Sequence, residues 1–182
     1  LSDAQARINA LPLIHRNLNQ MEDQTKVDLE PLLRELVGQI VDAQRVDRSR
    51  IAITVDVASV LVTGEIAVPI ALFTVETLSN VFHHAFHGER SGCAVSVRLE
   101  SREAGYALVI EDNGAGYVAG SVKPGIGDRL MKVFGRQVGG TVAADSKRER
   151  GTHVELIFTL PGETNPRLPA APGMESKAVS LS

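Results

Sequence analysis

The stretch from Ala67 to Phe86 constrains the fold of this chain more than any other, because it predicts a long helix that is apolar on most of its surface. Pro69 would fall in the first turn, where helices tolerate proline. The polar side chains of this stretch recur three or four residues apart and share one face; they are Glu76, Asn80, His83 or His84, and His87. An apolar helix with such a face often lines a site, although a face that simply meets solvent gives the same pattern.

The polar face carries groups suited to phosphate chemistry. The amide oxygen of Asn80 is a hard ligand for magnesium, which needs few protein groups when phosphates supply the rest. Glu76, one turn away, could accept a proton or orient a hydroxyl or a water molecule. Paired histidines can also indicate zinc. However, His83 and His84 diverge by about 100° on a helix, and no cysteine or further acid completes a plausible set of ligands.

The residues around this helix predict an α/β domain over residues 46–161. The sequence predicts strands at residues 51–55, 60–62, 93–100, 106–111, 141–144 and 153–158, the first of them from its alternating pattern. The third and fourth of these read as a hairpin with a turn around Gly105. A second helix follows a glycine-rich stretch and ends at Gly139 and Gly140; its apolar face consists of Leu130, Val133, Phe134 and Val138.

The two flanks of this domain differ from it in character. Residues 1–45 read as helical, with a kink or a late start at Pro12 and a second helix that begins near Asp28, a good N-cap residue. Residues 162–182 contain three prolines and few large apolar side chains, which predicts a disordered tail. The chain begins with Leu1 rather than methionine, so we expect it to be a piece of a longer protein.

Composition narrows the class of function. The net charge of −3 provides no electrostatic case for binding nucleic acid or an anionic membrane. No apolar run reaches transmembrane length, and the start does not have the pattern of a signal peptide. The single cysteine, Cys93, excludes an internal disulfide and a multi-thiolate metal site. We therefore expect a cytoplasmic location without membrane contact by this segment, although the full-length protein could be anchored upstream.

A glycine-containing loop directly follows one predicted strand. Asp112 stands at the end of that strand, where its carboxylate can accept a hydrogen bond from an exocyclic amine. Gly114 and Gly116 permit backbone angles closed to other residues and leave room for a flat ligand. The alternative interpretation of this Asp-Asn-Gly sequence is an ordinary turn.

Two further glycine-containing segments precede regular secondary structure, one before a helix and one before a strand. Gly125 and Gly127 open a helix, where backbone amides and the helix dipole favour phosphate. An ordinary loop is the alternative, and Asp128 suits it because an acid in the first turn stabilises a helix without any ligand. Gly151 and Thr152 precede the last strand, where the threonine hydroxyl could join Asp112 in holding a base through a shared water molecule.

The polar helix face, the glycine loops and the Gly-Thr pair, taken together in their order along the chain, resemble a known domain. It is the ATP-binding domain of sensor histidine kinases, within the GHKL (Bergerat-fold) ATPase superfamily. The family's N box resembles residues 76–86, its first glycine box 112–116, its second glycine box 125–127, and its closing Gly-Thr pair 151–152. Residues 10–18 and 27–37 resemble the end of a dimerisation and phosphotransfer hairpin. The resemblance implies a two-layer α/β sandwich preceded by a remnant of that helical hairpin, with ATP between the helices and a flexible lid at residues 117–124.

The resemblance also implies the role of each site residue. Asp112 would hold the adenine amine with support from Thr152. Asn80 would ligate magnesium and contact ATP, and Glu76 would assist phosphoryl transfer as the catalytic residue. The remaining ATP-binding positions would be His83, His84, Gly114, Gly116, Tyr117, Gly125, Ile126 and Gly127.

The partners follow from the same resemblance. The phosphoacceptor histidine of the family belongs to a helix upstream of Leu1, and His15 matches a later histidine of the hairpin. We therefore expect this chain to bind ATP and magnesium but not to phosphorylate itself, with the acceptor histidine lying upstream or on a partner. A response regulator receiver domain would be the next acceptor, and a homodimer through the hairpin is possible.

Two alternatives stay open. His83 stands where relatives often carry lysine, and Asp128 stands where they usually have a neutral residue, so both lower the positive charge near the phosphates. These changes favour a module whose nucleotide pocket has degenerated and which docks a response regulator or a partner kinase. An anti-sigma-type serine kinase would need no acceptor histidine, but the helical residues 1–45 argue against it.

Overall fold

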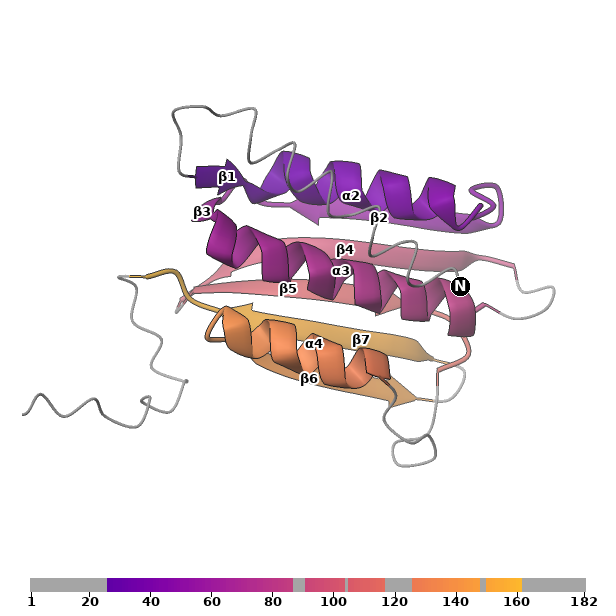
Figure 1. The fold of residues 1–182 in the computed structure, drawn as a ribbon. Helices are drawn as coiled ribbons and strands as arrows, with labels where there is room; N and C mark the ends of the chain where they lie inside the picture. Colours follow the sequence, from indigo (N-terminus) through magenta and orange to yellow (C-terminus); the bar gives the residue numbers. More distant parts are fainter. Residues whose placement is uncertain (1–25, 87–90, 104, 117–125, 148–149, 162–182) are drawn as a thin grey trace, which may run out of the picture.

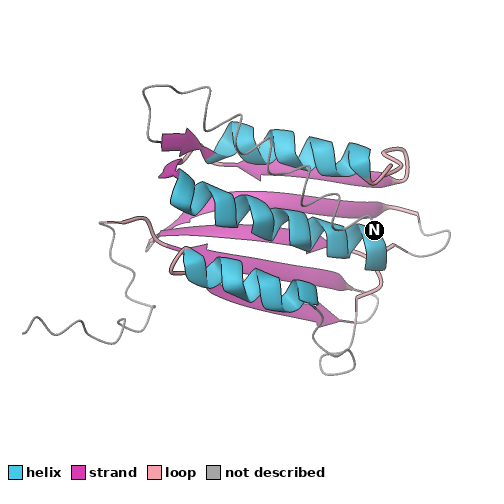
Figure 2. Ribbon diagram, in the orientation of Figure 1, coloured by secondary structure: helices cyan, strands magenta, loops and turns pink. Residues whose placement is uncertain are grey.

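The computed structural model describes residues 26–86, 91–103, 105–116, 126–147 and 150–161. Three helices lie side by side on one face of a five-stranded sheet (Figures 1 and 2). The helices are α2 (Leu29–Ala43), α3 (Gly64–His84) and α4 (Ile126–Gln137). The sheet consists of β2 (Ile51–Val57), β4 (Cys93–Arg102), β5 (Gly105–Asp112), β6 (Thr141–Lys147) and β7 (Gly151–Phe158). This arrangement confirms the predicted two-layer α/β sandwich.

The sheet has the order β2-β4-β5-β7-β6. Strands β2 and β4 run parallel, and α3 lies in the long connection that a parallel pair requires. The remaining pairs are antiparallel, including the predicted hairpin of β4 and β5, which closes where Arg102 faces Gly105. Strand β6 continues three residues beyond the predicted end because its pairing with β7 extends until Lys147 faces Gly151.

Helix α3 begins earlier than its sequence predicts. It starts at Gly64, directly after the strand residue Thr63, so Pro69 lies inside the helix and not in its first turn. By length and composition α3 could cross a membrane, contrary to the expectation that no run is apolar enough. However, 72% of the apolar 18-residue window within α3 is buried inside the domain, which identifies α3 as a core helix.

Helix α2 begins where the sequence predicts. The Asp28 carboxylate caps it by accepting a hydrogen bond from the Glu30 backbone N–H at 3.0 Å. Before the cap lies a short strand that was not predicted, β1 (Lys26–Asp28), which pairs with β3 (Leu61–Thr63) in a separate two-stranded sheet. The buried side of α2 joins the same core as α3 and the sheet; its members are Leu29, Leu32, Leu33, Leu36, Val37, Ile40 and Val41.

Several predictions fall on residues outside the described ranges. They concern the helical part of residues 1–25 with Pro12 and His15, the position of His87, the lid at 117–124, and the tail at 162–182. The division of the chain into residues 1–45, 46–161 and 162–182 also stays a prediction.

Candidate nucleotide-binding site

Helices α3 and α4 bring together three of the predicted site residues. Glu76 is buried, with 4% of its surface exposed, and Asn80 follows one turn later on α3. Gly127 is the second residue of α4 and faces both. A Cβ atom at Gly127 would lie 3.2 Å from Nδ2 of Asn80 and 3.4 Å from a carboxylate oxygen of Glu76. The start of α4 therefore approaches the polar face of α3 closely, and a side chain at Gly127 would crowd the pair.

The two histidines of α3 have different surroundings. Nδ1 of His83 lies 2.7 Å from the carbonyl oxygen of Ser79, and because a carbonyl only accepts, Nδ1 carries the proton in this bond. His84 is exposed on the next position of the helix, with its ring centroid 6.1 Å from that of His83. Within the described ranges, no three histidine, cysteine or acidic side chains form a group that could hold a metal ion.

The Asp112 loop is docked against the end of α3. Asp112 is the last residue of β5 and is buried, and one oxygen of its carboxylate accepts the backbone N–H of Gly114 at 2.7 Å. The backbone N–H of Ala115 donates to the carbonyl oxygen of Ala85 at 2.7 Å. A side chain at Gly114 would collide with Ala85, so the close approach requires glycine.

Asn113 connects the same loop to the start of β4. Its side-chain amide donates to the carbonyl oxygen of Gly92 at 2.7 Å and accepts the backbone N–H of Ala94 at 2.8 Å. On the other side, Gly116 has a φ of +57° and lies against the carbonyl of Lys147, where a side chain would collide. Loop 112–116 is thus held by α3, β4 and β6 at once.

Thr152 lies near the start of β7, beside the Asp112 strand. Its hydroxyl is 3.1 Å from the hydroxyl of Ser146, a buried residue of β6 that the sequence analysis missed. The preceding Gly151 has a φ of +82° and packs on the backbone of Asp112. The predicted strand at 141–144 ended before Ser146, and its pairing with Thr152 depends on the register of β6 and β7, which the sequence does not give.

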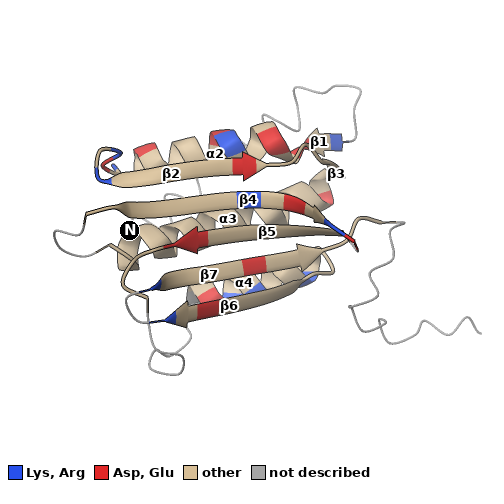
Figure 3. Cartoon of the chain, turned by 180° about the vertical axis from the view of Figure 1, so that it is seen from behind, with Lys and Arg blue, Asp and Glu red and all other residues tan. Residues whose placement is uncertain are grey.

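Figure 3 shows the opposite face of the sheet, which none of the described helices covers. This face carries a polar network of Arg98, Glu111 and His153. Nδ1 of His153 lies 2.6 Å from one carboxylate oxygen of Glu111, and the Arg98 guanidinium lies 2.7 Å from the other. Burial alone would raise the pKa of Glu111, but the hydrogen bonds from His153 and Arg98 outweigh it and lower that pKa below its ordinary value.

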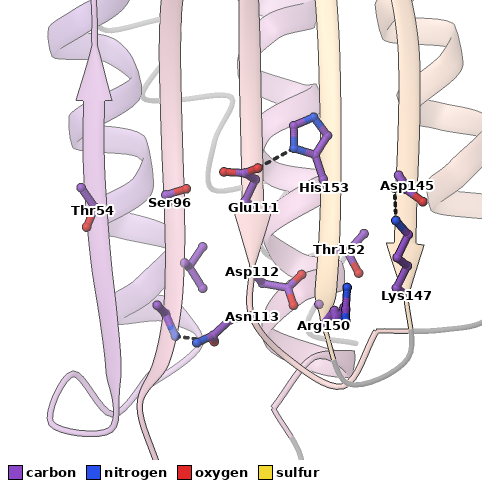
Figure 4. A pocket seen from close by; sticks show the side chains of 13 residues that line it. Thr54, Ser96, Glu111, Asp112, Asn113, Asp145, Lys147, Arg150, Thr152 and His153 are labelled. Carbon is purple, nitrogen blue, oxygen red and sulfur yellow. Dashed lines mark hydrogen bonds and ion pairs between the residues drawn. The ribbon is translucent and has the colours of Figure 1, made fainter.

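A cavity of about 360 Å³ opens beside this network, at the end of the sheet where β5 stops and β7 begins (Figure 4). All five strands of the sheet contribute to its wall. Thr54, Ser96, Glu111 and His153 lie in one row across four of them. Asp112 and Thr152 also line it, whereas Glu76, Asn80 and Gly127 do not. The cavity lies on the uncovered face of the sheet and touches Asp112 and Thr152 only at the strand ends, so it does not coincide with the expected site between the helices.

The remaining predicted positions are only partly described. Tyr117 and Gly125 lie outside the described ranges, and Ile126 is placed only as the first residue of α4. Asp128 follows in the first turn of α4, where an acid stabilises a helix by itself.

The matching family and the similar solved structures are both histidine kinases. A family described as "Histidine kinase" matches residues 1–44. The histidine kinase domain of the Erythrobacter litoralis EL346 blue-light activated histidine kinase has a TM-score of 0.78 at 22% identity, covering 87% of this chain and 75% of that one. A second structure of that kinase has a TM-score of 0.73 at 23% identity and covers 85% of this chain, which spans only 47% of it.

The cytoplasmic segment of histidine kinase QseC is more distant, with a TM-score of 0.56 at 19% identity over 88% of this chain and 95% of that one. No curated protein matched the sequence. At these identities the structural matches establish the fold, and the family match concerns the N-terminal segment. The chain thus combines a segment that matches the histidine kinase family with a domain that has the fold of histidine kinase catalytic domains.

Proposed function

We propose that this chain is the ATP-binding catalytic region of a two-component sensor histidine kinase, which transfers the γ-phosphoryl group of ATP to a histidine outside this chain. One observation carries the proposal: Gly127, at the start of α4, lies against both Asn80 and Glu76 of α3. A helix N-terminus favours phosphate, so its approach to an amide and a carboxylate is suited to a magnesium-bound triphosphate.

The donor set fits magnesium. The Asn80 amide oxygen would be its protein ligand, since magnesium retains several waters and takes the rest from phosphates. When bound, the ion would neutralise phosphate charge during transfer. Asn80 and the backbone at Gly127 would bind and orient the phosphates. At the other end of the site, Asp112 and Thr152 would hold the adenine.

Glu76 is proposed as the catalytic residue because its carboxylate is buried one turn from Asn80. There it can accept a hydrogen bond from the protonated ring nitrogen of an incoming histidine and take that proton as the other ring nitrogen forms the bond to phosphorus. The bond from phosphorus to the bridging oxygen breaks, and ADP leaves with the electron pair. Positioning and charge neutralisation supply most of the catalysis in such transfers.

The proposed partners follow from this reaction. The acceptor histidine would belong to a helix upstream or on a partner chain, and the phosphoryl group would then pass to an aspartate of a response regulator. The match of residues 1–44 to histidine kinases supports this assignment over an anti-sigma-type serine kinase. A cytoplasmic location is proposed by analogy with the cytoplasmic segment of QseC.

Calorimetric titration of ATP, with and without magnesium, tests the proposal. We expect the unaltered chain to bind ATP more tightly with magnesium. Asp112→Asn should weaken binding about tenfold or more, because a hydrogen bond to a charged group contributes about 1.5–3 kcal/mol. Asp145→Asn is the matched control: it removes an exposed carboxylate from the same cavity wall, and we expect ATP affinity to change less than about twofold.

A second experiment separates binding from transfer. Glu76→Gln should keep ATP binding but slow phosphorylation of an acceptor helix supplied in trans. The chain alone should acquire no acid-labile phosphohistidine, and detecting it would contradict the assignment of the acceptor to another segment.

A degenerate docking module is the second candidate function, and Asp128 favours it. This acid lies in the first turn of α4, next to Gly127, where it disfavours a phosphate. A folded chain that binds no ATP, but binds after Asp128→Ala and His83→Lys, would support this candidate over the kinase.

A further inference from the structure

Ser146 contributes a buried hydroxyl to the base-binding end of the site. It lies on β6 directly opposite Thr152 in the strand register, with 8% of its surface exposed. Its Oγ atom is 3.1 Å from Oγ1 of Thr152 and 3.2 Å from the carbonyl oxygen of Gly151. The three groups therefore form a short hydrogen-bonded chain at the end of the sheet.

The direction of the protons in this chain follows from its members. A carbonyl oxygen can only accept, so the Ser146 hydroxyl donates its proton to Gly151. A hydroxyl has a single proton, and the bond between Ser146 and Thr152 therefore uses the proton of Thr152. As a result, Thr152 has only lone pairs left for any ligand that reaches its hydroxyl.

Asp112 adds a second acceptor at the same place. Glu111 faces His153 in the register of β5 and β7, so Asp112 and Thr152 are the next residues along the two strands and share the other sheet face. Figure 4 shows both side chains at this end of the cavity. An ionised carboxylate only accepts hydrogen bonds. This edge of the site therefore presents acceptors from two strands.

We propose that Ser146 is a positioning residue that makes the site selective for a purine with a 6-amino group, by holding the Thr152 hydroxyl as an acceptor. The inference rests on the proposed ATP binding and deepens it. A 6-amino group donates protons to the two acceptors, directly or through one water molecule. A 6-oxo purine presents another acceptor there, which leaves buried polar groups unpaired.

The test compares ATP with inosine triphosphate, which carries a 6-oxo group, by calorimetric titration in the presence of magnesium. The unaltered chain should favour ATP. In Ser146→Ala, the Thr152 hydroxyl is released and can donate to a 6-oxo group. We expect the preference to fall about fivefold, which corresponds to the net contribution of one neutral hydrogen bond. Ser146→Thr keeps a hydroxyl and should retain the preference.

Two further variants test whether Ser146 acts through Thr152. Thr152→Val should lower the preference by itself, and adding Ser146→Ala to it should have no further effect on the preference. Thr141→Ala, an exposed hydroxyl on the same strand, is the control and should leave both affinities unchanged. If Ser146→Ala does not fold, Ser146→Cys replaces it, because a thiol of similar shape hydrogen-bonds only weakly.

Each remaining outcome has a separate meaning. ATP binding with an unaltered preference in folded Ser146→Ala or Ser146→Cys overturns the role of Ser146 and leaves the kinase proposal standing. An equal loss of affinity for both nucleotides also overturns it, since that is the effect of a merely structural residue. Failure of the unaltered, folded chain to bind either nucleotide overturns both proposals.

Discussion

At the scale of single residues, the site depends on glycines that let other groups approach. Gly114 contacts Ala85 at the end of α3, and Gly127 contacts Asn80 in its middle. Both glycines were predicted from loop composition, and Asn80 was predicted from helical spacing, but Ala85 was not singled out by the sequence. The contacts between loop and helix join residues far apart in the chain, so no local pattern could indicate them.

Gly114→Ala tests this close approach. The added Cβ would collide with the Ala85 carbonyl, and we expect the free energy of unfolding to fall by about 1–3 kcal/mol, the usual cost of overpacking. Urea denaturation measures the change. Gly38→Ala is the control, because Gly38 lies within α2 with no atom near the added methyl group; it should stabilise the protein by about 0.5–1 kcal/mol. Equal effects of the two substitutions would contradict the packing argument.

At the scale of elements, the strength of a local signal decided which parts were predictable. The hairpin of β4 and β5 was predicted because two strand-like segments flank a short turn around Gly105, and the structure pairs eight residues between the two strands. Strand β1 was missed because three residues carry too little pattern, and it forms only by pairing with β3. The start of α3 was misplaced because Gly64 is a weak helix former, yet the helix begins there as soon as β3 ends.

Asp28 connects two of these elements, and its removal is expected to weaken both. Its carboxylate accepts the backbone N–H groups of Glu30 and Val60 at 3.0 and 3.2 Å and the Ser59 hydroxyl at 2.6 Å. Asp28→Ala leaves these donors unpaired, so urea denaturation should show a loss of about 1–3 kcal/mol. Asp42→Ala, which removes an exposed partner of Arg48, should change stability by less than about 1 kcal/mol. If Asp28→Ala lowered the free energy of unfolding no more than Asp42→Ala does, the connecting role of Asp28 would be disproved.

At the scale of the whole molecule, the sheet separates two polar surfaces of different character. The helix-covered side carries Glu76 and Asn80, and the other side carries the network of Arg98, Glu111 and His153. Because neighbouring residues of a strand point to opposite faces, Glu111 lies back to back with Asp112. Protonation of Glu111 in this network should be measurable as a change in the free energy of unfolding of the domain.

Glu111 is expected to make the protein less stable in acid. Burial raises the pKa of Glu111, but His153 and Arg98 lower it by a larger amount. The pKa in the folded state therefore lies below the unfolded value of about 4.3. The stabilisation is complete above the unfolded pKa and is lost as pH falls through the folded pKa. Urea denaturation between about pH 6 and pH 3 should show a smaller loss of stability for Glu111→Gln than for the unaltered chain.

Glu35→Gln provides the control for this pH series, because Glu35 is an exposed carboxylate on α2 whose bond to Gln39 carries no charge pair. It should follow the unaltered chain across the whole range. An identical pH dependence for Glu111→Gln and the unaltered chain would contradict the lowered pKa of Glu111.

The sequence by itself determined the class of the domain and predicted which residues form its candidate site. Helical and strand periodicities act over adjacent residues, so they are legible without a structure, and so are the polar face of α3 and the glycines of its partner loops. Only the tertiary structure decided which of these groups meet. It placed Gly127 on Asn80, docked the Asp112 loop on Ala85, and set Ser146 opposite Thr152. Such contacts depend on strand register and helix packing, which are properties of the assembled core and not of any one segment.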